Sequence, residues 1–543
     1  MTQHRSGGAP RWDLRSVPDA LARRYVREGW WTDASIGTMV AEGLAASASS
    51  AFAVRSDARP WRGTIGEVDR AARSFASSLR AMGVGAGDVV VFQLPNWVEA
   101  AIVFWGAAYV GAVVVPIVHF YGPKEVSYIL DVTKPDVVVT ADRFGTRDFL
   151  ASYEQLSAGA SWRWLVVGDA AARLPNAAEP LSALLDADPL TEPVPVDPDD
   201  PVLVAFTSGT TRDPKGVIHS HRTIGFEARQ LNAMLPMTGP PPIIGAPVGH
   251  FIGMLSAFLV SLLRDQPVNL VDVWDPGTVL RAMSDEHLGV SGGSTYFLTS
   301  LIDHPDFSPE HLALMPWSGL GGSPIPVAVA ERATRMGIEV FRSYGSTEHP
   351  SITGSYLDEP AVKRLTTDGH ALPGVELRLD DEGQILTRGA DCFLGYTDPT
   401  LTAKVFDADG WYHTGDIGVL DDDGYLTITD RISDIIIRGG ENISAQEVEE
   451  LLMGLGGVAE VSVVAAPDER LGEHAAAIFR VHAGRSVPTL DEVRTHLAAA
   501  GLAKQKWPEA IYGVVEFPRT ASGKVQKFRL RDQLRDGTLE SGS

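Results

Sequence analysis

Residues 64–94 read TIGEVDRAARSFASSLRAMGVGAGDVVVFQL, and this stretch decides the fold class. Apolar residues recur at helical spacing through its first part, with Thr64 as a helix N-cap and Gly83 as the stop. Asp88–Leu94 is a short Val-rich run of the kind found in buried strands. The stretch therefore predicts a helix followed by a buried strand of a parallel sheet.

The same alternation of helix and strand recurs along the chain. Ala100–Gly111 is rich in small, helix-compatible residues, and Ala112–Val118 is β-branched. Residues 125–140 and 328–341 repeat the pattern. This recurrence predicts an α/β protein with a large N-terminal domain, in which mainly parallel sheets are flanked by helices.

Two long apolar stretches require a comparison with membrane spans. Ala100–Val118 has no charge over a length close to that of a transmembrane helix. Gly111, however, divides it into a helical half and a strand-like half that reaches Pro116. Ile243–Leu263 is interrupted by proline and glycine. We expect neither stretch to span a membrane.

The texture of the chain changes towards its C-terminal end. From about Gly410 short strands and turns follow one another, with Asp421–Gly424 as a hairpin turn, which predicts a β-subdomain. Helix and strand patterns alternate again after Ser433 and predict a small α+β domain joined by a hinge. The expected domains are 1–431 and 432–543.

Composition excludes several classes of protein. The 543 residues carry a formal net charge of −23, and 44% of them are hydrophobic. This balance argues against nucleic-acid binding, which depends on basic surface. The single cysteine, Cys392, excludes an intrachain disulfide framework, and the first residues have no apolar core like that of a signal peptide. The cytoplasm is the expected location.

Residues 207–216, TSGTTRDPKG, form a loop between two apolar runs. Its hydroxyls, glycines and lysine offer many hydrogen-bond donors with little bulk, so the loop could wrap the phosphates of a nucleotide. It does not match the usual P-loop pattern. An ordinary polar hairpin loop is the alternative that composition leaves open.

Four more segments, taken together with this loop, indicate a family. They are Tyr344–His349 (YGSTEH), Trp411–Asp416 (WYHTGD), Asp430–Asp434 (DRISD) with Gly439–Ile443 (GGENI) just beyond it, and Pro518–Lys524 (PRTASGK). Together, in this order, the five segments closely resemble the adenylate-forming (AMP-binding) superfamily, and in particular its acyl-CoA synthetase branch. The resemblance extends from the Gly111–Pro116 region to Arg531.

The resemblance implies a reaction in two steps. A carboxylate attacks the α-phosphate of ATP to give an acyl-adenylate and pyrophosphate, and the thiol of coenzyme A then displaces AMP. ATP and CoA would be co-substrates, with Mg²⁺ bridging the phosphates. Because the first step brings two anions together, the site must supply positive charge and exclude water.

The nucleotide-binding residues follow from the matched segments. The resemblance assigns the phosphates of ATP to Thr207, Ser208, Gly209, Thr210, Thr211 and Lys215. It assigns the adenine pocket to Gly321, Gly322, Ser323, Tyr344 and Gly345, with Tyr344 stacking on the base. Asp416 would accept hydrogen bonds from the ribose hydroxyls, and Arg431 would reach the ribose or a phosphate. Glu348 and Thr210 would hold Mg²⁺.

Catalysis and domain movement are assigned in the same way. Lys524 would be the principal catalytic residue, brought to the α-phosphate by a mobile C-terminal domain, with Glu348 and Thr347 as further catalytic residues. Ser433 stands at the hinge, where relatives commonly have Asp or Lys. Gly439 and Gly440 would line the channel for CoA, because glycine lets the pantetheine arm pass close to the backbone.

The acyl substrate is expected to be apolar. His250 and Phe251 match positions that border the acyl pocket, and they suggest a medium-chain, branched or cyclic carboxylic acid. Three alternatives remain open: a stand-alone adenylation enzyme that loads an acyl or aryl acid onto a carrier protein, a luciferase-like oxygenase, and a non-catalytic nucleotide-binding relative. The last should have lost Lys524, Glu348 or Asp416, and all three are present. The oligomeric state, monomer or homodimer, stays open.

Overall fold

An eight-stranded sheet forms the centre of the N-terminal domain in the computed structural model, which describes residues 11–169, 174–207, 214–438, 441–468, 470–520 and 523–539. Its strands, in spatial order, are β21 (Gly395–Tyr396), β11 (Lys215–Ser220), β10 (Pro201–Thr207), β4 (Val113–Pro116), β3 (Val89–Gln93), β5 (Val137–Ala141), β8 (Arg163–Val167) and β9 (Ala178–Pro180). The six strands from β10 to β9 are parallel to one another. Strand β11 is antiparallel to both of its neighbours, β10 and β21. The predicted, mainly parallel sheet is confirmed.

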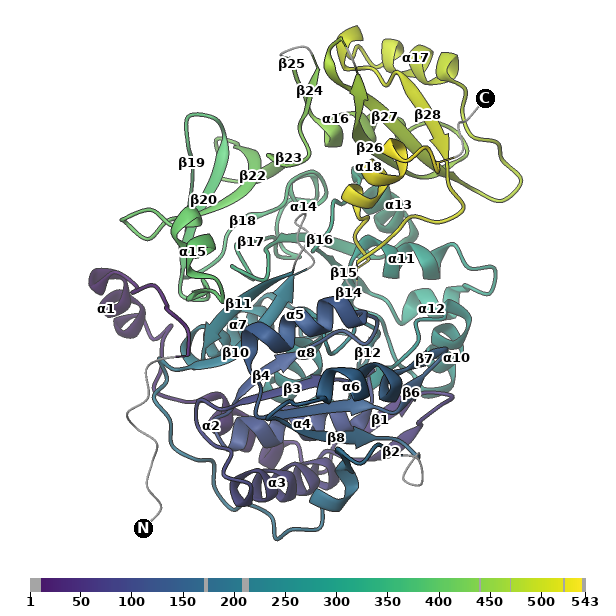
Figure 1. Ribbon diagram of the computed structural model, residues 1–543. Helices are drawn as coiled ribbons and strands as arrows, with labels where there is room; N and C mark the ends of the chain where they lie inside the picture. The colour runs from purple at the N-terminus through teal and green to yellow at the C-terminus, as the bar shows by residue number, and fades with distance from the viewer. Residues whose placement is uncertain are drawn as a thin grey trace.

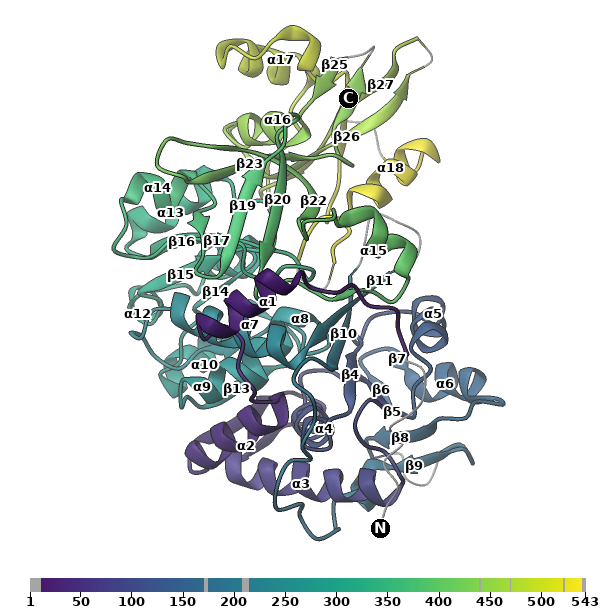
Figure 2. The same ribbon diagram turned by 90° about the vertical axis from the view of Figure 1, so that its left-hand side faces the viewer.

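Helices cover both faces of this sheet. They include α2 (Ile36–Ala46), α3 (Ile65–Ala81), α4 (Val98–Tyr109), α5 (Pro123–Thr133), α6 (Phe149–Ser157) and α7 (His221–Met234). Helix α1 (Asp19–Arg27) lies apart from the sheet (Figure 1), and its Arg24 forms an ion pair with Glu376. In Figures 1 and 2, α5 and α6 lie on one side of the sheet and α3 and α4 on the other. The predicted start of α3 is confirmed, because Thr64 and Glu67 form a capping box there.

The apolar stretch Ala100–Val118 contains most of α4, a turn at Gly111 and strand β4. Gly111 has φ +72°, a value that glycine adopts easily, and a Cβ there would lie 2.4 Å from the side chain of Val196. Every residue of α4 is buried, so this helix is apolar all round because it lies inside the domain. No helix in the described part of the chain is long and apolar enough to cross a membrane.

Two further sheets complete the α/β part. One comprises β12 (Ile243–Ile244), β13 (Val268–Val271), β1 (Ala51–Arg55) and β2 (Trp61–Thr64). The other comprises β14 (Gly292–Gly293), β15 (Trp317–Leu320), β16 (Glu339–Tyr344), β17 (Thr353–Gly354) and β18 (His370–Ala371). Their helices are α8 (Phe251–Leu255), α9 (Ser261–Leu263), α10 (Pro276–Glu286), α11 (Thr295–Ile302), α12 (Pro309–Ala313), α13 (Val327–Met336) and α14 (Ala361–Thr366). A π-helical turn, Ser256–Val260, joins α8 to α9.

The β-subdomain is an antiparallel sheet of β19 (Val375–Leu379), β20 (Gln384–Gly389), β22 (Tyr412–Leu420) and β23 (Leu426–Arg431), with α15 (Pro399–Val405) beside it. It begins at Val375, so the prediction that the texture changes near Gly410 was wrong. β19 alternates apolar and charged residues, as half-buried strands do, and β20 is mostly buried, so the prediction overlooked a signal that the sequence carries. The hairpin between β22 and β23 is confirmed.

The C-terminal domain packs β25 (Glu441–Ile443), β24 (Ile436–Arg438), β27 (Gly472–Val481), β26 (Val458–Asp468) and β28 (Ala510–Gly513) with α16 (Ala445–Leu452), α17 (Leu490–Ala499) and α18 (Lys527–Arg535). It has its own apolar core, which includes Val463, Phe479 and Leu497. In Figure 1 it lies above the N-terminal domain, next to the β-subdomain. The prediction of a small α+β domain is confirmed.

Candidate active site

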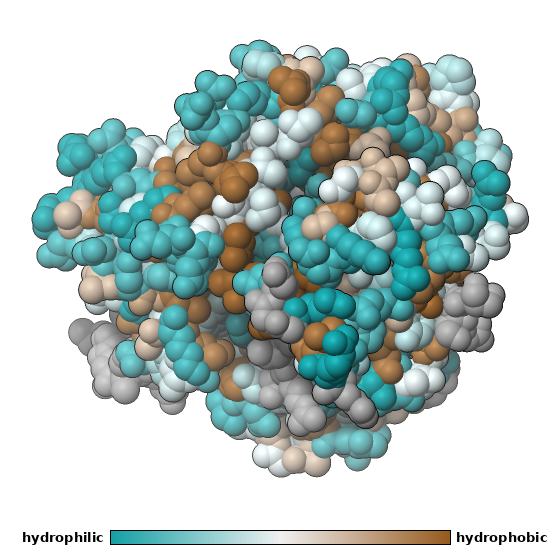
Figure 3. Space-filling model, turned by 90° about the horizontal axis from the view of Figure 1, so that it is seen from above, coloured by the Kyte–Doolittle hydropathy of each residue, from teal (hydrophilic) through white to brown (hydrophobic). Residues whose placement is uncertain are grey.

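A cavity of about 1050 Å³ lies where the N-terminal domain, the β-subdomain and the C-terminal domain meet. Its walls come from α7, the β14–β16 region, β22 and the loop before α18. Seen from above, the surface is hollowed between the β-subdomain and the C-terminal domain (Figure 3). Side chains of both polar and apolar kinds surround this hollow, as expected of a site for a large amphipathic ligand.

The cavity brings together the described residues that the sequence assigned to the site. They are Thr207, Lys215, His250, Phe251, Gly321, Gly322, Ser323, Tyr344, Gly345, Thr347, Glu348, Asp416, Arg431, Ser433 and Lys524. Ser208, Gly209, Thr210, Thr211, Gly439 and Gly440 lie outside the described residues. Segments more than 300 residues apart in the chain thus line one space.

Asp416 is the centre of a buried polar group beside the cavity. Its Oδ2 accepts a hydrogen bond from the hydroxyl of Tyr344 at 2.6 Å, and its Oδ1 accepts one from Nε of Arg431. The register of the hairpin places Asp416 opposite Arg431. The charge of Asp416 raises the pKa of the Arg431 guanidinium, and burial together with Asp416 raises the pKa of the Tyr344 hydroxyl. A fixed carboxylate, which only accepts hydrogen bonds, can accept them from the two hydroxyl groups of a diol.

Glu348 occupies another part of the cavity wall. It is 9% exposed, and its Oε1 accepts a hydrogen bond from the hydroxyl of Tyr396 at 2.8 Å. The ammonium of Lys215 lies 5.5 Å from the centroid of the Tyr396 ring. An acid and a cation from distant segments therefore both lie close to one aromatic side chain.

Lys524 reaches the cavity from the C-terminal domain. Burial and the positive charge of Arg431 together lower the pKa of its ammonium to about 8, against the opposing effect of Asp416 and Glu348. The backbone before it is held in place, because the Lys524 amide donates to the hydroxyl of Thr520 at 3.1 Å. The cavity thus contains a partly desolvated ammonium.

Two histidines lie at the cavity wall: His250 lines the cavity, and His219 is next to the wall residue Phe251. Burial lowers the pKa of His250 to about 4, with a further contribution from Lys524, so this ring is neutral at physiological pH. His219 packs against Phe251 with ring centroids 5.3 Å apart, and its Nε2 is 2.7 Å from the carbonyl oxygen of Thr347. Burial also lowers the pKa of His219 to about 4, so both rings are neutral at physiological pH.

Gly345 is needed for the turn after β16. A Cβ on it would lie 1.7 Å from the carbonyl oxygen of Pro350, a distance that no side chain tolerates. The turn folds back so tightly that the amide of Ser346 donates to the carbonyl of His349 at 2.9 Å. This geometry presents Tyr344 and Glu348 to the same cavity.

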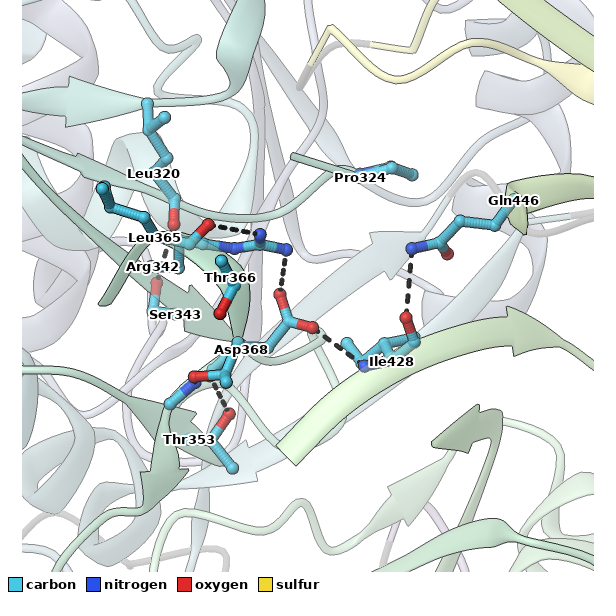
Figure 4. Close-up of polar contacts among 12 residues, drawn as sticks. Leu320, Pro324, Arg342, Ser343, Thr353, Leu365, Thr366, Asp368, Ile428 and Gln446 are labelled. Atoms are coloured by element: carbon cyan, nitrogen blue, oxygen red, sulfur yellow. Dashed lines mark hydrogen bonds and ion pairs between the residues drawn. The ribbon is translucent and has the colours of Figure 1, made fainter. Parts of the chain in front are cut away.

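A buried ion pair and two hydrogen bonds connect the three parts of the molecule (Figure 4). Nη2 of Arg342, at 2.7 Å, donates to Oδ1 of Asp368, and Oδ2 of Asp368 accepts from the amide of Ile428 at 2.9 Å. The side chain of Gln446, in α16, donates to the carbonyl of Ile428 at 3.1 Å. Strand β23 is thereby attached to β16 on one side and to the C-terminal domain on the other.

Two wall residues were missed by the sequence analysis. Tyr396 lies in a segment, residues 389–397, that offers no catalytic pattern, and only the pairing of β21 with β11 places it beside Glu348. Glu227 lies on α7 at helical spacing from apolar residues that line the cavity. An acid on the apolar face of a helix is a signal that could have found it.

The residues around Glu348 fit a divalent cation that is held mainly by a ligand. The described residues contain no group of three or more His, Cys, Asp or Glu arranged around a metal ion. Mg²⁺, however, commonly binds through one or two carboxylates together with substrate phosphates. The nearly buried carboxylate of Glu348 on the cavity wall satisfies that requirement.

Comparison with known proteins identifies the family. The model of the AMP-binding enzyme family matches residues 45–397, and the model of the AMP-binding enzyme C-terminal domain matches residues 447–524. The chain belongs to the AMP-binding enzyme family. The predicted resemblance to this superfamily is confirmed.

Curated members of the AMP-binding family resemble the chain over almost its whole length. The medium-chain fatty-acid–CoA ligase of Escherichia coli strain K12 is 32% identical over 94% of this chain and 92% of its own length. The second relative is the 3-[(3aS,4S,7aS)-7a-methyl-1,5-dioxo-octahydro-1H-inden-4-yl]propanoyl:CoA ligase of Rhodococcus jostii strain RHA1. It is 38% identical over 85% of this chain and 92% of its own length. The crystal structure of ATP-bound MatB from Rhodopseudomonas palustris superposes with a TM-score of 0.80 at 26% identity, covering 91% of this chain and 99% of that one.

Proposed function

We propose that this AMP-binding enzyme is an ATP-dependent acyl-CoA ligase that works through an acyl-adenylate. The observation that carries the proposal is the meeting of Lys524 with Glu348, Asp416 and Lys215 in one cavity. The acid's carboxylate oxygen attacks the α-phosphorus of ATP, and pyrophosphate leaves. The CoA thiolate then attacks the acyl carbonyl carbon, and AMP leaves.

In the first step the cations of the wall offset the charge of two approaching anions. Lys524 would act at the α-phosphate and the attacking carboxylate, where negative charge is redistributed in the transition state. Lys215 and the loop Thr207–Thr211 would bind the outgoing pyrophosphate. Mg²⁺ held by Glu348, with Thr210 as a further ligand, would supply charge neutralisation on the phosphates. Thr347 lies next to Glu348 and would support its position.

The nucleoside would lie beside the β-subdomain. Asp416 would exchange its present donors for the ribose hydroxyls, while Arg431 stays close to the ribose or a phosphate. Tyr344 would stack on adenine over the floor formed by Gly321, Gly322 and Ser323. Gly345 allows the turn that brings this aromatic ring to the cavity.

The acyl part would occupy the apolar end of the cavity, next to His250 and Phe251. Leu231, Met234 and Val260 line this end and favour hydrocarbon. We propose an apolar medium-chain, branched or cyclic acid. The names of the two relatives above, one for medium-chain fatty acids and one for a bicyclic propanoyl group with two oxo substituents, support this class.

The second step requires the C-terminal domain to turn about Ser433. We place the domain boundary between Arg431 and Ile432, so that 1–431 binds the nucleotide and 432–543 moves. Gly439 and Gly440 would then line the channel of the CoA thiol. A cytoplasmic setting, where ATP and CoA are the available co-substrates, agrees with this role.

A screen of carboxylic acids by ATP–pyrophosphate exchange, repeated with and without CoA, tests the proposal. We expect exchange with an apolar acid, and formation of its acyl-CoA when CoA is present. Exchange followed by transfer only to a carrier protein would identify a stand-alone adenylation enzyme instead. Absence of exchange with every acid would refute the ligase assignment.

A further inference from the structure

A buried carboxyl group stands among the apolar residues of the acyl wall. Helix α7 presents Glu227, Leu231 and Met234 to the cavity, at a spacing that places them on one helix face, and Leu235 continues that line. Glu227 is 1% exposed. Carboxyl groups are rarely buried without a partner, so the contacts of this one decide what it does.

Only one of the two carboxyl oxygens of Glu227 has a hydrogen-bond partner among the described residues. Oε1 accepts from the hydroxyl of Ser351 at 3.0 Å, whereas Oε2 is buried and has no partner. No Lys or Arg of the described chain forms an ion pair with Glu227. A buried polar oxygen left in this state costs free energy until a ligand or a water bonds to it.

The polar groups behind Glu227 are already satisfied. The amide of Ser351 donates to Oδ2 of Asp391 at 3.2 Å, and Oδ1 of Asp391 lies 3.1 Å from Nε2 of His349. Nδ1 of His349 lies 2.8 Å from the hydroxyl of Thr387. The network is therefore closed at this side, and Oε2 of Glu227 is its open end, on a residue that lines the cavity.

The surroundings of Glu227 also set its protonation state. Burial raises the pKa of its carboxyl well above the ordinary value, and the negative charge of Asp391 raises it further. Both effects favour the neutral carboxylic acid over the carboxylate. A neutral acid donates one hydrogen bond through its hydroxyl, and the natural partner in a hydrocarbon pocket is a carbonyl oxygen.

We propose that Glu227 is a specificity residue that donates a hydrogen bond to a ketone oxygen on the hydrocarbon part of the acid substrate. The inference rests on the proposed ligase function and narrows its substrate class to cyclic or branched acids that carry a ketone. Recognition of a polar group in an otherwise apolar pocket discriminates strongly, because the analogue without that group leaves the protein atom unpaired.

Two acids of almost equal shape test the proposal: 3-(4-oxocyclohexyl)propanoic acid and 3-cyclohexylpropanoic acid. Their kcat/KM values in ATP–pyrophosphate exchange are measured for the wild type, Glu227→Gln and Glu227→Leu. We expect the wild type to prefer the keto acid by about tenfold or more, the value of one hydrogen bond. Glu227→Leu should lose this preference or invert it, and Glu227→Gln, which keeps an N–H donor, should retain part of it.

Gln230→Leu is the matched control, because Gln230 is a buried polar residue of the same helix that does not line the cavity. Gln230→Leu should change kcat/KM by the same factor for both acids. The KM for ATP and the melting temperature show whether each variant keeps its fold. If Glu227→Leu lowers kcat/KM equally for both acids, Glu227 has a structural role, with water as its only further hydrogen-bond partner. That result would overturn the proposal.

Two further outcomes are decisive. Exchange with other apolar acids, without preference for the keto acid, would refute the ketone site and leave the ligase function standing. A preference for 3-(4-aminocyclohexyl)propanoic acid would overturn the proposal in favour of an ionised Glu227 that binds a cation. Absence of exchange with every acid would instead refute the proposed function itself.

Discussion

At the scale of single residues, Lys524 shows how the cavity prepares a cation. In a solvated position its ammonium would attract phosphate only weakly, because water screens the charge. Burial beside Arg431 lowers the pKa of Lys524 to about 8, so the charged form is held at a cost that an incoming anion relieves. The same desolvation strengthens its interaction with the α-phosphate.

Replacement of Lys524 by alanine should separate the two half-reactions. We expect Lys524→Ala to slow ATP–pyrophosphate exchange by about a hundredfold or more, because it removes a charge that acts on the transition state. Thioester formation from a supplied acyl-adenylate should persist. Lys506→Ala is the control, since Lys506 pairs with Glu447 away from the cavity wall. Equal loss of both half-reactions would contradict the assigned role.

The pKa of Lys524 also predicts a pH dependence. Since the ammonium is the active form, kcat/KM for ATP in the adenylation step should fall as pH rises through about 8, by about tenfold per pH unit beyond it. The slower variant Lys524→Arg should lack this limb, because its guanidinium stays protonated. A descending limb that persists in Lys524→Arg would show that another group titrates.

At the scale of elements, the β22–β23 hairpin assembles the nucleoside site. Asp416 and Arg431 are 15 positions apart in the chain, and the hairpin register places them opposite each other. The hairpin is held by Asp368, which bonds to Ile428 of β23 and to Arg342 of β16 (Figure 4). A single buried carboxylate thus connects the β-subdomain to the sheet that carries Tyr344.

Removal of that carboxylate should destabilise the molecule. Side chains of Arg342 and Asp368 are only 4% and 7% exposed, so Asp368→Ala leaves a buried guanidinium without its counter-charge. We expect a loss of about 3–5 kcal/mol in the free energy of unfolding, measured by denaturant titration. Asp423→Ala, which removes an exposed partner of Lys363 on the same hairpin, should leave the transition unchanged. Equal midpoints for both variants would contradict the role of Asp368.

At the scale of the whole molecule, the C-terminal domain contributes Lys524 to a cavity that is otherwise lined largely by the N-terminal domain. The hydroxyl of Ser444 donates to the carbonyl of Thr429 at 2.9 Å, and the guanidinium of Arg519 lies 5.4 Å from the centroid of the Tyr296 ring. These contacts, together with the hydrogen bond from Gln446 to Ile428, join the C-terminal domain to the rest of the chain near the cavity. Such an interface is compatible with domain movement.

Restricting the proposed hinge should affect only the second step. Ser433 lies in the turn between β23 and β24, and proline there fixes φ and opposes a change of domain orientation. We expect Ser433→Pro to keep most of its ATP–pyrophosphate exchange while thioester formation slows by about tenfold or more. Ser433→Ala should resemble the wild type in both assays. Equal rates for Ser433→Pro and Ser433→Ala in thioester formation would refute the hinge.

The sequence by itself determined the fold class, the domain order and the chemical family. Helix and strand periods repeat through residues 64–141, and the caps at Thr64 and Gly83 are local signals that need no tertiary context. The glycine, hydroxyl, lysine and acid motifs also lie in short contiguous segments. The confirmed family membership was therefore readable from the chain. The alternation of apolar and charged residues in β19 was readable too, and the prediction overlooked it.

Tertiary structure alone decided which groups face one another. Tyr396 meets Glu348 only through the pairing of β21 with β11, and Arg342 meets Asp368 only because two sheets adjoin. The lowered pKa of Lys524 and the unpartnered oxygen of Glu227 arise from burial and from neighbours that are distant in sequence. The sequence specifies the type of each residue, but its burial and its contacts depend on which distant segments the folded chain brings together.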